Sequence, residues 1–209
     1  MFIGVYNLAN FVTLLGLACA VVSCFIAGNG SDMALKLAVC VFLLSGLCDM
    51  FDGRIARGAG SRTRKEKVFG IQIDTVCDMV SFGVTPAVIC YFCGFNRWYD
   101  ILAYIVYAAC AAIRLAYFNT QAIEETPDLN MKGFTGVPVP FSCLVMPLLL
   151  ILKTVIPSVL AVNVVFDVIM FMVGMAFILN VKIKKLNIVQ SIILVLFEIL
   201  CVTLMFVLK

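Results

Sequence analysis

The chain has 209 residues, of which 64% are hydrophobic and only 13% are charged, and its mean hydropathy is +1.13. Soluble globular domains carry about 25% charged residues, so this composition excludes a soluble protein and indicates an integral membrane protein. The net charge of +3 at pH 7 is explained by basic flanks that face anionic lipid, and it predicts no nucleic-acid partner. The absence of histidine excludes a Ser-His-Asp site, a His-ligated zinc ion and a histidine general base.

Apolar segments of roughly 18 to 25 residues, each long enough to cross a hydrocarbon core of about 30 Å as a helix, recur along the chain. We predict seven membrane-spanning helices at about residues 10–28, 33–56, 70–94, 98–118, 138–155, 159–181 and 187–208. The first lacks a basic leader and a small-residue cleavage site, so we expect it to be retained. The predicted fold class is an all-α polytopic membrane protein that forms a single domain over residues 1–209.

Lysine and arginine are distributed unevenly between the two sides of these helices. If the N-terminus is cytoplasmic, all but four of the 15 basic residues lie in or beside the second, fourth and sixth connections. The four on the other side are Lys36, Arg97, Lys153 and Lys209. Because basic residues accumulate on the cytoplasmic side of membrane proteins, we predict a multi-pass protein of the cell membrane. Its polar loops, at about residues 57–69 and 119–137, would be cytoplasmic.

Four aspartates stand out against this apolar background. Asp49 and Asp52 are three residues apart near the end of the second predicted helix, and Asp74 and Asp78 are four apart near the start of the third. Each pair therefore occupies one face of its helix. A short basic connection allows the two faces to meet at the cytoplasmic boundary in one cluster of four carboxylates. Two like charges about 4 Å apart repel by roughly 4 kcal/mol at an effective dielectric near 20, so protons or cations must balance the cluster.

A ligand set made only of carboxylate oxygens selects hard cations such as Mg²⁺, Mn²⁺ or Ca²⁺. Two such ions would balance four carboxylates and would suit a diphosphate substrate, because they clamp its oxygens during displacement at phosphorus. Gly53, Ala56 and Gly70 leave the helix surfaces bare where a ligand could approach, although small residues also serve helix packing. The other interpretation of the aspartates is charges at loop ends in water, but acids within membrane segments usually mark function.

The aspartates belong to a longer pattern, Asp49-x-x-Asp52-Gly53-x-x-Ala56-Arg57 followed by Gly70-x-x-x-Asp74-x-x-x-Asp78. It resembles the signature of the CDP-alcohol phosphatidyltransferases, membrane enzymes that move a phosphatidyl group from a CDP-linked lipid onto an alcohol. Twelve residues separate Arg57 from Gly70, where the family more usually has eight or nine, and this predicts a longer cytoplasmic loop. The resemblance implies the six-helix bundle of that family plus about one extra transmembrane helix.

Within that family, three further stretches are similar to the phosphatidylserine synthases: residues 80–87, 114–119 and 134–140. The resemblance covers about residues 1–140. Two departures are Tyr117, which stands where an arginine is common, and Thr75-Val76-Cys77, which replaces a more usual Ser-Leu-Ala. The resemblance implies transfer of the phosphatidyl group from CDP-diacylglycerol to the hydroxyl of L-serine, by attack on the β-phosphorus, with release of CMP.

The resemblance also implies a role for each matched residue. Asp49, Asp52 and Asp74 would bind two divalent cations, Mg²⁺ or Mn²⁺, with Ca²⁺ as a substitute or an inhibitor. Asp78 would complete the metal site and act as the general base on the incoming hydroxyl. The CDP-lipid pocket would consist of Asp52, Gly53, Ala56, Arg57 and Gly70. The family further implies a homodimer surrounded by membrane lipids.

Serine carries a carboxylate that needs a cation. Arg114, near the cytoplasmic end of the fourth predicted helix, is the first candidate, and Lys132 and Asn119 are the others. Each also has a structural interpretation: a snorkelling boundary arginine, a solvated loop charge and a helix cap. Asp167 and Glu198 lie within the last two predicted helices and belong to no motif.

Three alternatives compete with a serine-specific enzyme. The first keeps the chemistry but uses glycerol phosphate, inositol phosphate or choline as the alcohol. The second is a cation transporter, which would place carboxylates near the middle of the bilayer on discontinuous helices. Here the aspartates lie near the boundary, on helices that we expect to lack an internal proline. The third, a structural membrane scaffold, leaves the acidic cluster unexplained.

Overall fold

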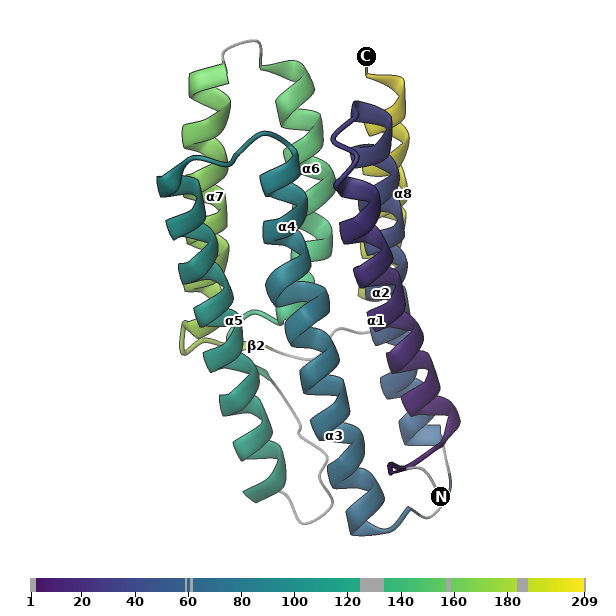
Figure 1. The fold of residues 1–209 in the computed structure, drawn as a ribbon. Helices are drawn as coiled ribbons and strands as arrows, with labels where there is room; N and C mark the ends of the chain where they lie inside the picture. The colour runs from purple at the N-terminus through teal and green to yellow at the C-terminus, as the bar shows by residue number, and fades with distance from the viewer. Residues whose placement is uncertain are drawn as a thin grey trace.

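The computed structural model describes residues 3–58, 60, 62–124, 134–156, 159–183 and 188–208. Its α-helices are α1 (Leu8–Ala27), α2 (Asp32–Gly58), α3 (Arg64–Asp78), α4 (Thr85–Phe92), α5 (Trp98–Glu124), α6 (Ser142–Val155), α7 (Val159–Ile178) and α8 (Ile188–Val207). Helices α3 and α4 belong to one continuous rod. The helices of the described residues therefore form seven rods, in the order predicted. The two ends of the chain lie at opposite ends of the bundle (Figure 1).

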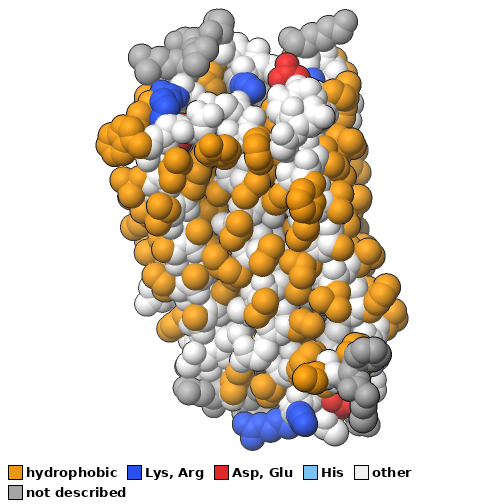
Figure 2. All heavy atoms as spheres, viewed as in Figure 1, with side chains coloured by type: hydrophobic (Ala, Val, Ile, Leu, Met, Phe, Trp, Pro, Cys, Tyr) orange, Lys and Arg blue, Asp and Glu red, His pale blue; other side chains and the backbone are white. Residues whose placement is uncertain are grey.

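The surface of the bundle matches a lipid environment. Five of the helical rods are long and apolar enough to cross a membrane, and two shorter apolar helices, Val139–Val155 and Ile192–Val207, accompany them. On the face drawn in Figure 2, hydrophobic side chains cover the middle of the molecule and most charged side chains gather at its two ends. Helices that satisfy their own backbone hydrogen bonds are suited to cross hydrocarbon. The predicted all-α polytopic membrane protein is confirmed.

Glycines allow several helices to approach closely. A Cβ atom built on Gly46 of α2 would lie 2.6 Å from Sγ of Cys143 on α6, and one on Gly174 of α7 would lie 3.0 Å from Cα of Tyr107 on α5. Contacts of this kind are typical of helix packing inside membranes, where van der Waals contact replaces much of the hydrophobic driving force. Any side chain at these two positions would push the helices apart.

A short ribbon ties the segments that flank α6 and α7. Strand β1 (Phe134–Thr135) pairs in antiparallel register with β2 (Lys182–Ile183), so that Phe134 faces Ile183. Gly136 follows β1 with a φ of 77°, and a Cβ atom there would lie 2.4 Å from the carbonyl oxygen of Phe177. Only glycine fits both the backbone angle and this close approach.

The helix α3 begins earlier than the sequence predicts. Its N-cap is Thr63, whose hydroxyl accepts a hydrogen bond from the backbone N–H of Glu66 at 3.3 Å, while the Glu66 carboxylate accepts one from the backbone N–H of Thr63 at 2.8 Å. This reciprocal capping box satisfies two N–H groups at the helix start. The polar residues 64–69, expected in the loop, are therefore helical. The prediction of a longer cytoplasmic loop is wrong, because only residues 59–63 separate α2 from α3.

The rod that carries Asp74 and Asp78 is interrupted by a π-helical segment, η1 (Met79–Val84), between α3 and α4. Pro86 has no N–H to donate to the carbonyl of Phe82 four residues earlier. The Tyr107 hydroxyl of α5 donates to that carbonyl instead, at 2.6 Å. The expectation that the aspartate-bearing helices lack an internal proline is therefore wrong. The widened turn directly follows Asp78, and such turns occur frequently at functional sites.

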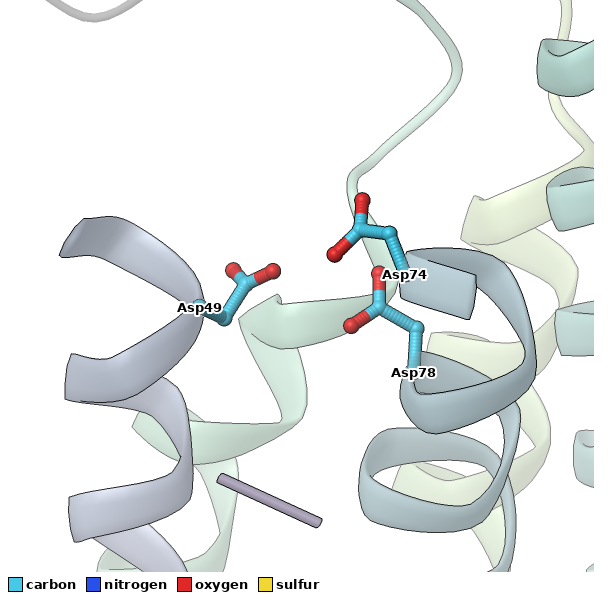
Figure 3. Close-up of side chains that lie close together, drawn as sticks. All are labelled: Asp49, Asp74 and Asp78. Carbon is cyan, nitrogen blue, oxygen red and sulfur yellow. The ribbon is translucent and has the colours of Figure 1, made fainter. Parts of the chain in front are cut away.

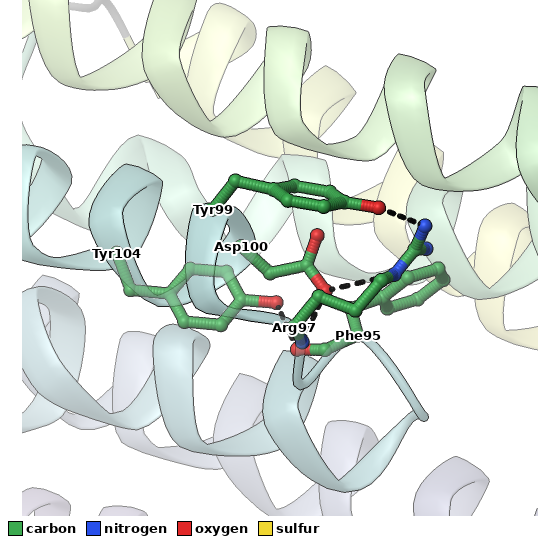
Figure 4. A network of polar contacts seen from close by, with 5 residues as sticks. All are labelled: Phe95, Arg97, Tyr99, Asp100 and Tyr104. Carbon is green, nitrogen blue, oxygen red and sulfur yellow. Dashed lines mark hydrogen bonds and ion pairs between the residues drawn. The ribbon is translucent and has the colours of Figure 1, made fainter.

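A polar network closes the end of the bundle where α5 begins (Figure 4). The Asp100 carboxylate is fully buried; it accepts a hydrogen bond from the backbone N–H of Arg97 at 2.8 Å and lies 3.5 Å from Nε of the Arg97 guanidinium. The same guanidinium contacts the Tyr99 hydroxyl, and the Tyr104 hydroxyl donates to the carbonyl of Phe95 at 2.8 Å. Asp167 on α7 lies within electrostatic range of this group.

Candidate functional site

Three of the four motif aspartates converge between α2 and α3. Asp49 comes from α2, whereas Asp74 and Asp78 come from successive turns of α3, and the three side chains point toward one another (Figure 3). One carboxylate oxygen of each lies within 4.8 Å of the others. Among the residues that the structure describes, no lysine or arginine forms a salt bridge with any of the three. The described part of the chain thus provides no direct ion pair for this cluster.

Asp52, the fourth motif aspartate, turns toward a different helix. It is buried, and its Oδ2 accepts a hydrogen bond of 2.6 Å from the Thr13 hydroxyl of α1. The structure therefore brings three carboxylates together and holds the fourth beside them. Asp52 still lines one small cavity with Asp49 and Asp78, and the hydroxyl-bearing residues Thr13 and Ser45 line it too.

The geometry of the cluster fits a hard divalent cation. Two oxygens that bind one such ion at about 2.1–2.5 Å lie up to about 4–5 Å apart, which matches the separation of the three carboxylates. Asp74 Oδ1 is buried and has no hydrogen-bond partner in the described part of the chain. A buried carboxylate oxygen without a partner is costly unless a ligand satisfies it. The residue types and their spacing both agree with a metal site.

The small motif residues lie where arginine side chains approach the helices. A Cβ atom on Gly53 would lie 3.4 Å from Nη1 of Arg57, and one on Gly70 would lie 4.0 Å from Nη1 of Arg62. Ala56, between Gly53 and Arg57 in the motif, is half-buried. The motif includes Arg57 but not Arg62, which lies in the gap between the two halves of the motif. Two guanidinium groups thus lie over the glycines of the motif.

Two of the three candidates for the head group lie on α5, and both are buried. Arg114 is only 6% exposed, which contradicts the interpretation as a snorkelling arginine; its guanidinium carbon lies 4.8 Å from the centre of the Phe118 ring. Its Nε has no hydrogen-bond partner in the described structure, and Asp78 lies within its electrostatic range. Asn119 contacts the Thr75 hydroxyl of α3 at 2.8 Å. Lys132 lies outside the described residues.

Sequence reasoning missed the partners of two hydroxyl groups near the aspartates. Thr13 belongs to no motif, and only the fold of α1 against α2 and α3 brings it to Asp52. Thr75 lies inside the motif, directly after Asp74, but its hydroxyl reaches α5 and contacts none of the aspartates. A polar residue in an apolar helix was the available signal for both, since such residues tend to face other helices.

The fold and the site together define a class: a multi-pass helical membrane protein with an acidic cluster, suited to a divalent cation, between its second and third rods. A sequence model of the CDP-alcohol phosphatidyltransferase family matches residues 6–173. The chain therefore belongs to the CDP-alcohol phosphatidyltransferase family, and the resemblance carried by the aspartate motif is confirmed.

Within that family, the chain is similar to proteins named CDP-diacylglycerol–serine O-phosphatidyltransferase. The relative from Saccharomyces cerevisiae is 35% identical over 103 residues, which are 47% of this chain and 36% of the relative. The relative from Methanocaldococcus jannaschii is 36% identical over 103 residues, 49% of this chain and 45% of the relative. The relative from Helicobacter pylori strain 26695 is 31% identical over 150 residues, 70% of this chain and 58% of the relative. The chain thus spans less than two thirds of each of these relatives.

Proposed function

We propose that this protein is a phosphatidylserine synthase, which transfers the phosphatidyl group of CDP-diacylglycerol to the hydroxyl of L-serine and releases CMP. The observation that carries the proposal is the convergence of Asp49, Asp74 and Asp78 within 4.8 Å, inside the motif of a family of phosphatidyltransferases. The names of the similar proteins support serine as the acceptor. A buried arginine within electrostatic range of Asp78 supports an acceptor with a carboxylate.

The carboxylates would hold the cations. Asp49, Asp74 and Asp78 surround one position, and Asp52, which shares a cavity with Asp49 and Asp78, would contribute to a second. When bound, two Mg²⁺ or Mn²⁺ ions would offset the charge of the carboxylates and of the diphosphate. Arg57 and Arg62, which lie over Gly53 and Gly70, would bind the phosphates of the CDP moiety by charge-assisted hydrogen bonds.

The transfer itself needs one proton acceptor. Asp78 would take the proton of the serine hydroxyl while the hydroxyl oxygen attacks the β-phosphorus of CDP-diacylglycerol. The bond from the β-phosphorus to the bridging oxygen breaks, and CMP leaves with that oxygen and its electron pair. Arg114 would bind the serine carboxylate and thereby orient the hydroxyl.

The proposed setting follows from the charge distribution. Residues 1–209 would form one catalytic domain in the cell membrane, with the acidic cluster at the cytoplasmic face, where Arg57 and Arg64 end α2 and begin α3. The family resemblance supports a homodimer in contact with membrane lipids. Both points are open to direct tests, by labelling of introduced cysteines and by mass measurement in detergent.

CMP release tests the proposal. Purified protein in detergent receives CDP-diacylglycerol and Mn²⁺ or Mg²⁺, with and without L-serine, beside the Asp78→Asn variant. We expect release that depends on serine in the wild type and none in the variant. Release only with glycerol phosphate, inositol phosphate or choline would overturn serine as the acceptor. No release with any alcohol, together with Mn²⁺ uptake into proteoliposomes, would favour a transporter instead.

A further inference from the structure

The Thr75 hydroxyl makes two short contacts with oxygen positions. Its Oγ1 lies 2.9 Å from the carbonyl oxygen of Ile71 and 2.8 Å from the atom placed as Oδ1 of Asn119. A hydroxyl has only one proton to donate, so it cannot serve both oxygens. In one of the two contacts, therefore, Thr75 must accept the hydrogen bond, and its partner must donate the proton.

Only one of the two partners can supply that proton. The Ile71 carbonyl is an acceptor without a proton, whereas the oxygen and nitrogen of an asparagine amide have nearly the same shape and are assigned from their hydrogen bonds. The consistent network has Thr75 donating to Ile71 and the Asn119 amide nitrogen donating to Thr75 Oγ1. The carbonyl oxygen of Asn119 is then the amide atom turned away from Thr75.

The position of this pair connects it to the site. Thr75 lies on α3 between Asp74 and Asp78 in the sequence, and Asn119 lies on α5, the helix that carries Arg114. Asn119 is only 8% exposed and Arg114 only 6%. Water can therefore form few hydrogen bonds with either side chain. The direction of the Asn119 amide then decides whether a bound group meets a donor or an acceptor.

We infer that Thr75 is a positioning residue that selects the acceptor alcohol through Asn119. The inference rests on the proposed function and names the substrate class more narrowly. The Asn119 carbonyl oxygen would accept a hydrogen bond from an ammonium group, while Arg114 binds a carboxylate. A phosphorylated alcohol would instead bring phosphate oxygens against a carbonyl oxygen, with no proton between them. The pair thus favours an amino-acid alcohol and disfavours glycerol phosphate or inositol phosphate.

Matched substitutions at position 75 test the inference. Thr75→Val keeps the shape but removes the oxygen that holds the amide, whereas Thr75→Ser keeps that oxygen. We expect Thr75→Val to raise the KM for serine about tenfold, the scale of one hydrogen bond to a charged group, and to lower the preference for serine over glycerol phosphate. The kcat and the KM for CDP-diacylglycerol should stay within about twofold, since the change affects acceptor binding alone. Thr75→Ser should resemble the wild type.

Substitutions at position 119 test the direction of the amide separately. Asn119→Asp presents an oxygen in both directions, and Asn119→Leu presents none. With the carbonyl toward the ammonium group, Asn119→Asp should keep a KM for serine within about threefold of the wild type, and Asn119→Leu should raise it about tenfold. Equal loss in both variants would overturn the assignment, because it would mean that the amide acts as a donor.

The outcomes separate this inference from the proposed function. Serine-dependent CMP release by the wild type, with an unchanged KM for serine in Thr75→Val, would overturn the role of Thr75 and leave the synthase standing. CMP release by the wild type that needs another alcohol would overturn both. If Thr75→Val does not fold, the comparison of Asn119→Asp with Asn119→Leu decides the amide direction on its own.

Discussion

Two groups of acidic side chains lie at different levels of the same bundle, and their charges are balanced differently. Where α5 begins, Asp100 has an arginine of its own, Arg97, and a hydrogen bond from that residue's backbone (Figure 4). Between α2 and α3, Asp49, Asp74 and Asp78 converge with no salt bridge to the described lysines and arginines (Figure 3).

The difference separates an acid that serves the fold from acids that serve a ligand. A buried charge is tolerated when the chain pairs and hydrogen-bonds it, and breaking such a pair destabilises the protein. Acids that the chain leaves unbalanced cost free energy until something from outside offsets them. We therefore expect substitutions in the two groups to affect different properties, stability in one and activity in the other.

The largest contrast is expected between Asp78→Asn and Asp100→Ala. Asp78→Asn should lower CMP release about a thousandfold or more, because it removes both the general base and a metal ligand, and should leave thermal unfolding near that of the wild type. Asp100→Ala should lower the free energy of unfolding by about 1–3 kcal/mol, because it leaves buried partners without their acceptor, while the folded fraction stays active. An inactive but stable Asp100→Ala would contradict the comparison.

Removal of divalent cations should affect the motif aspartates and leave the group around Asp100 unchanged. Protein treated with a chelator should lose activity and regain it with Mn²⁺ or Mg²⁺. A cation at a hundred times its dissociation constant should stabilise the folded protein by about 2.7 kcal/mol, measured as a shift in thermal unfolding in detergent. The shift should disappear in Asp74→Asn and persist in Asp100→Ala. A shift of equal size in both variants would place the cation elsewhere.

The hydroxyl that supports Asp52 should have a smaller effect. Thr13→Val removes the hydrogen bond of 2.6 Å to the Asp52 carboxylate and keeps the shape of the side chain. Partners that orient metal ligands typically contribute a factor of about 10 to 100 in affinity, so the Mn²⁺ concentration for half-maximal activity should rise about tenfold. Thr13→Ser is the matched control and should restore it. An unchanged Mn²⁺ requirement would mean that Asp52 does not hold the cation.

The sequence is sufficient for the seven helical rods and for three of the four carboxylates of the predicted cluster, and the reason is periodicity. Long apolar segments specify helices in lipid, and a spacing of three or four places Asp74 and Asp78 on one face. Periodicity does not say which neighbouring helix supplies a partner. Thr13 of α1 contacts Asp52 of α2, and Asp167 of α7 comes within electrostatic range of Asp100 on α5, through tertiary packing alone.

The start and the interruption of the third rod are harder to predict from the sequence, for another reason. The capping box at Thr63 extends α3 into residues whose polarity is typical of a loop, so polarity alone misplaces the start of the helix. Pro86 explains part of the interruption, but the π segment also needs the Tyr107 hydroxyl to satisfy the carbonyl of Phe82. That donor comes from α5, so the sequence of the third rod by itself does not contain the solution.

The smallest effect is expected at Asp167, and it tests whether the group around Asp100 is balanced by the chain. Asp167 on α7 lies within electrostatic range of Asp100 and of Arg97, and Asp100 already has Arg97 as its partner. Asp167→Asn removes the charge at position 167 and keeps the shape of the side chain. It should change the free energy of unfolding by no more than about 0.5 kcal/mol and leave CMP release unchanged, measured in the same detergent as Asp100→Ala. A large loss of stability would show that the Asp167 charge itself is needed, and that this group, like the motif aspartates, depends on a cation from outside the chain.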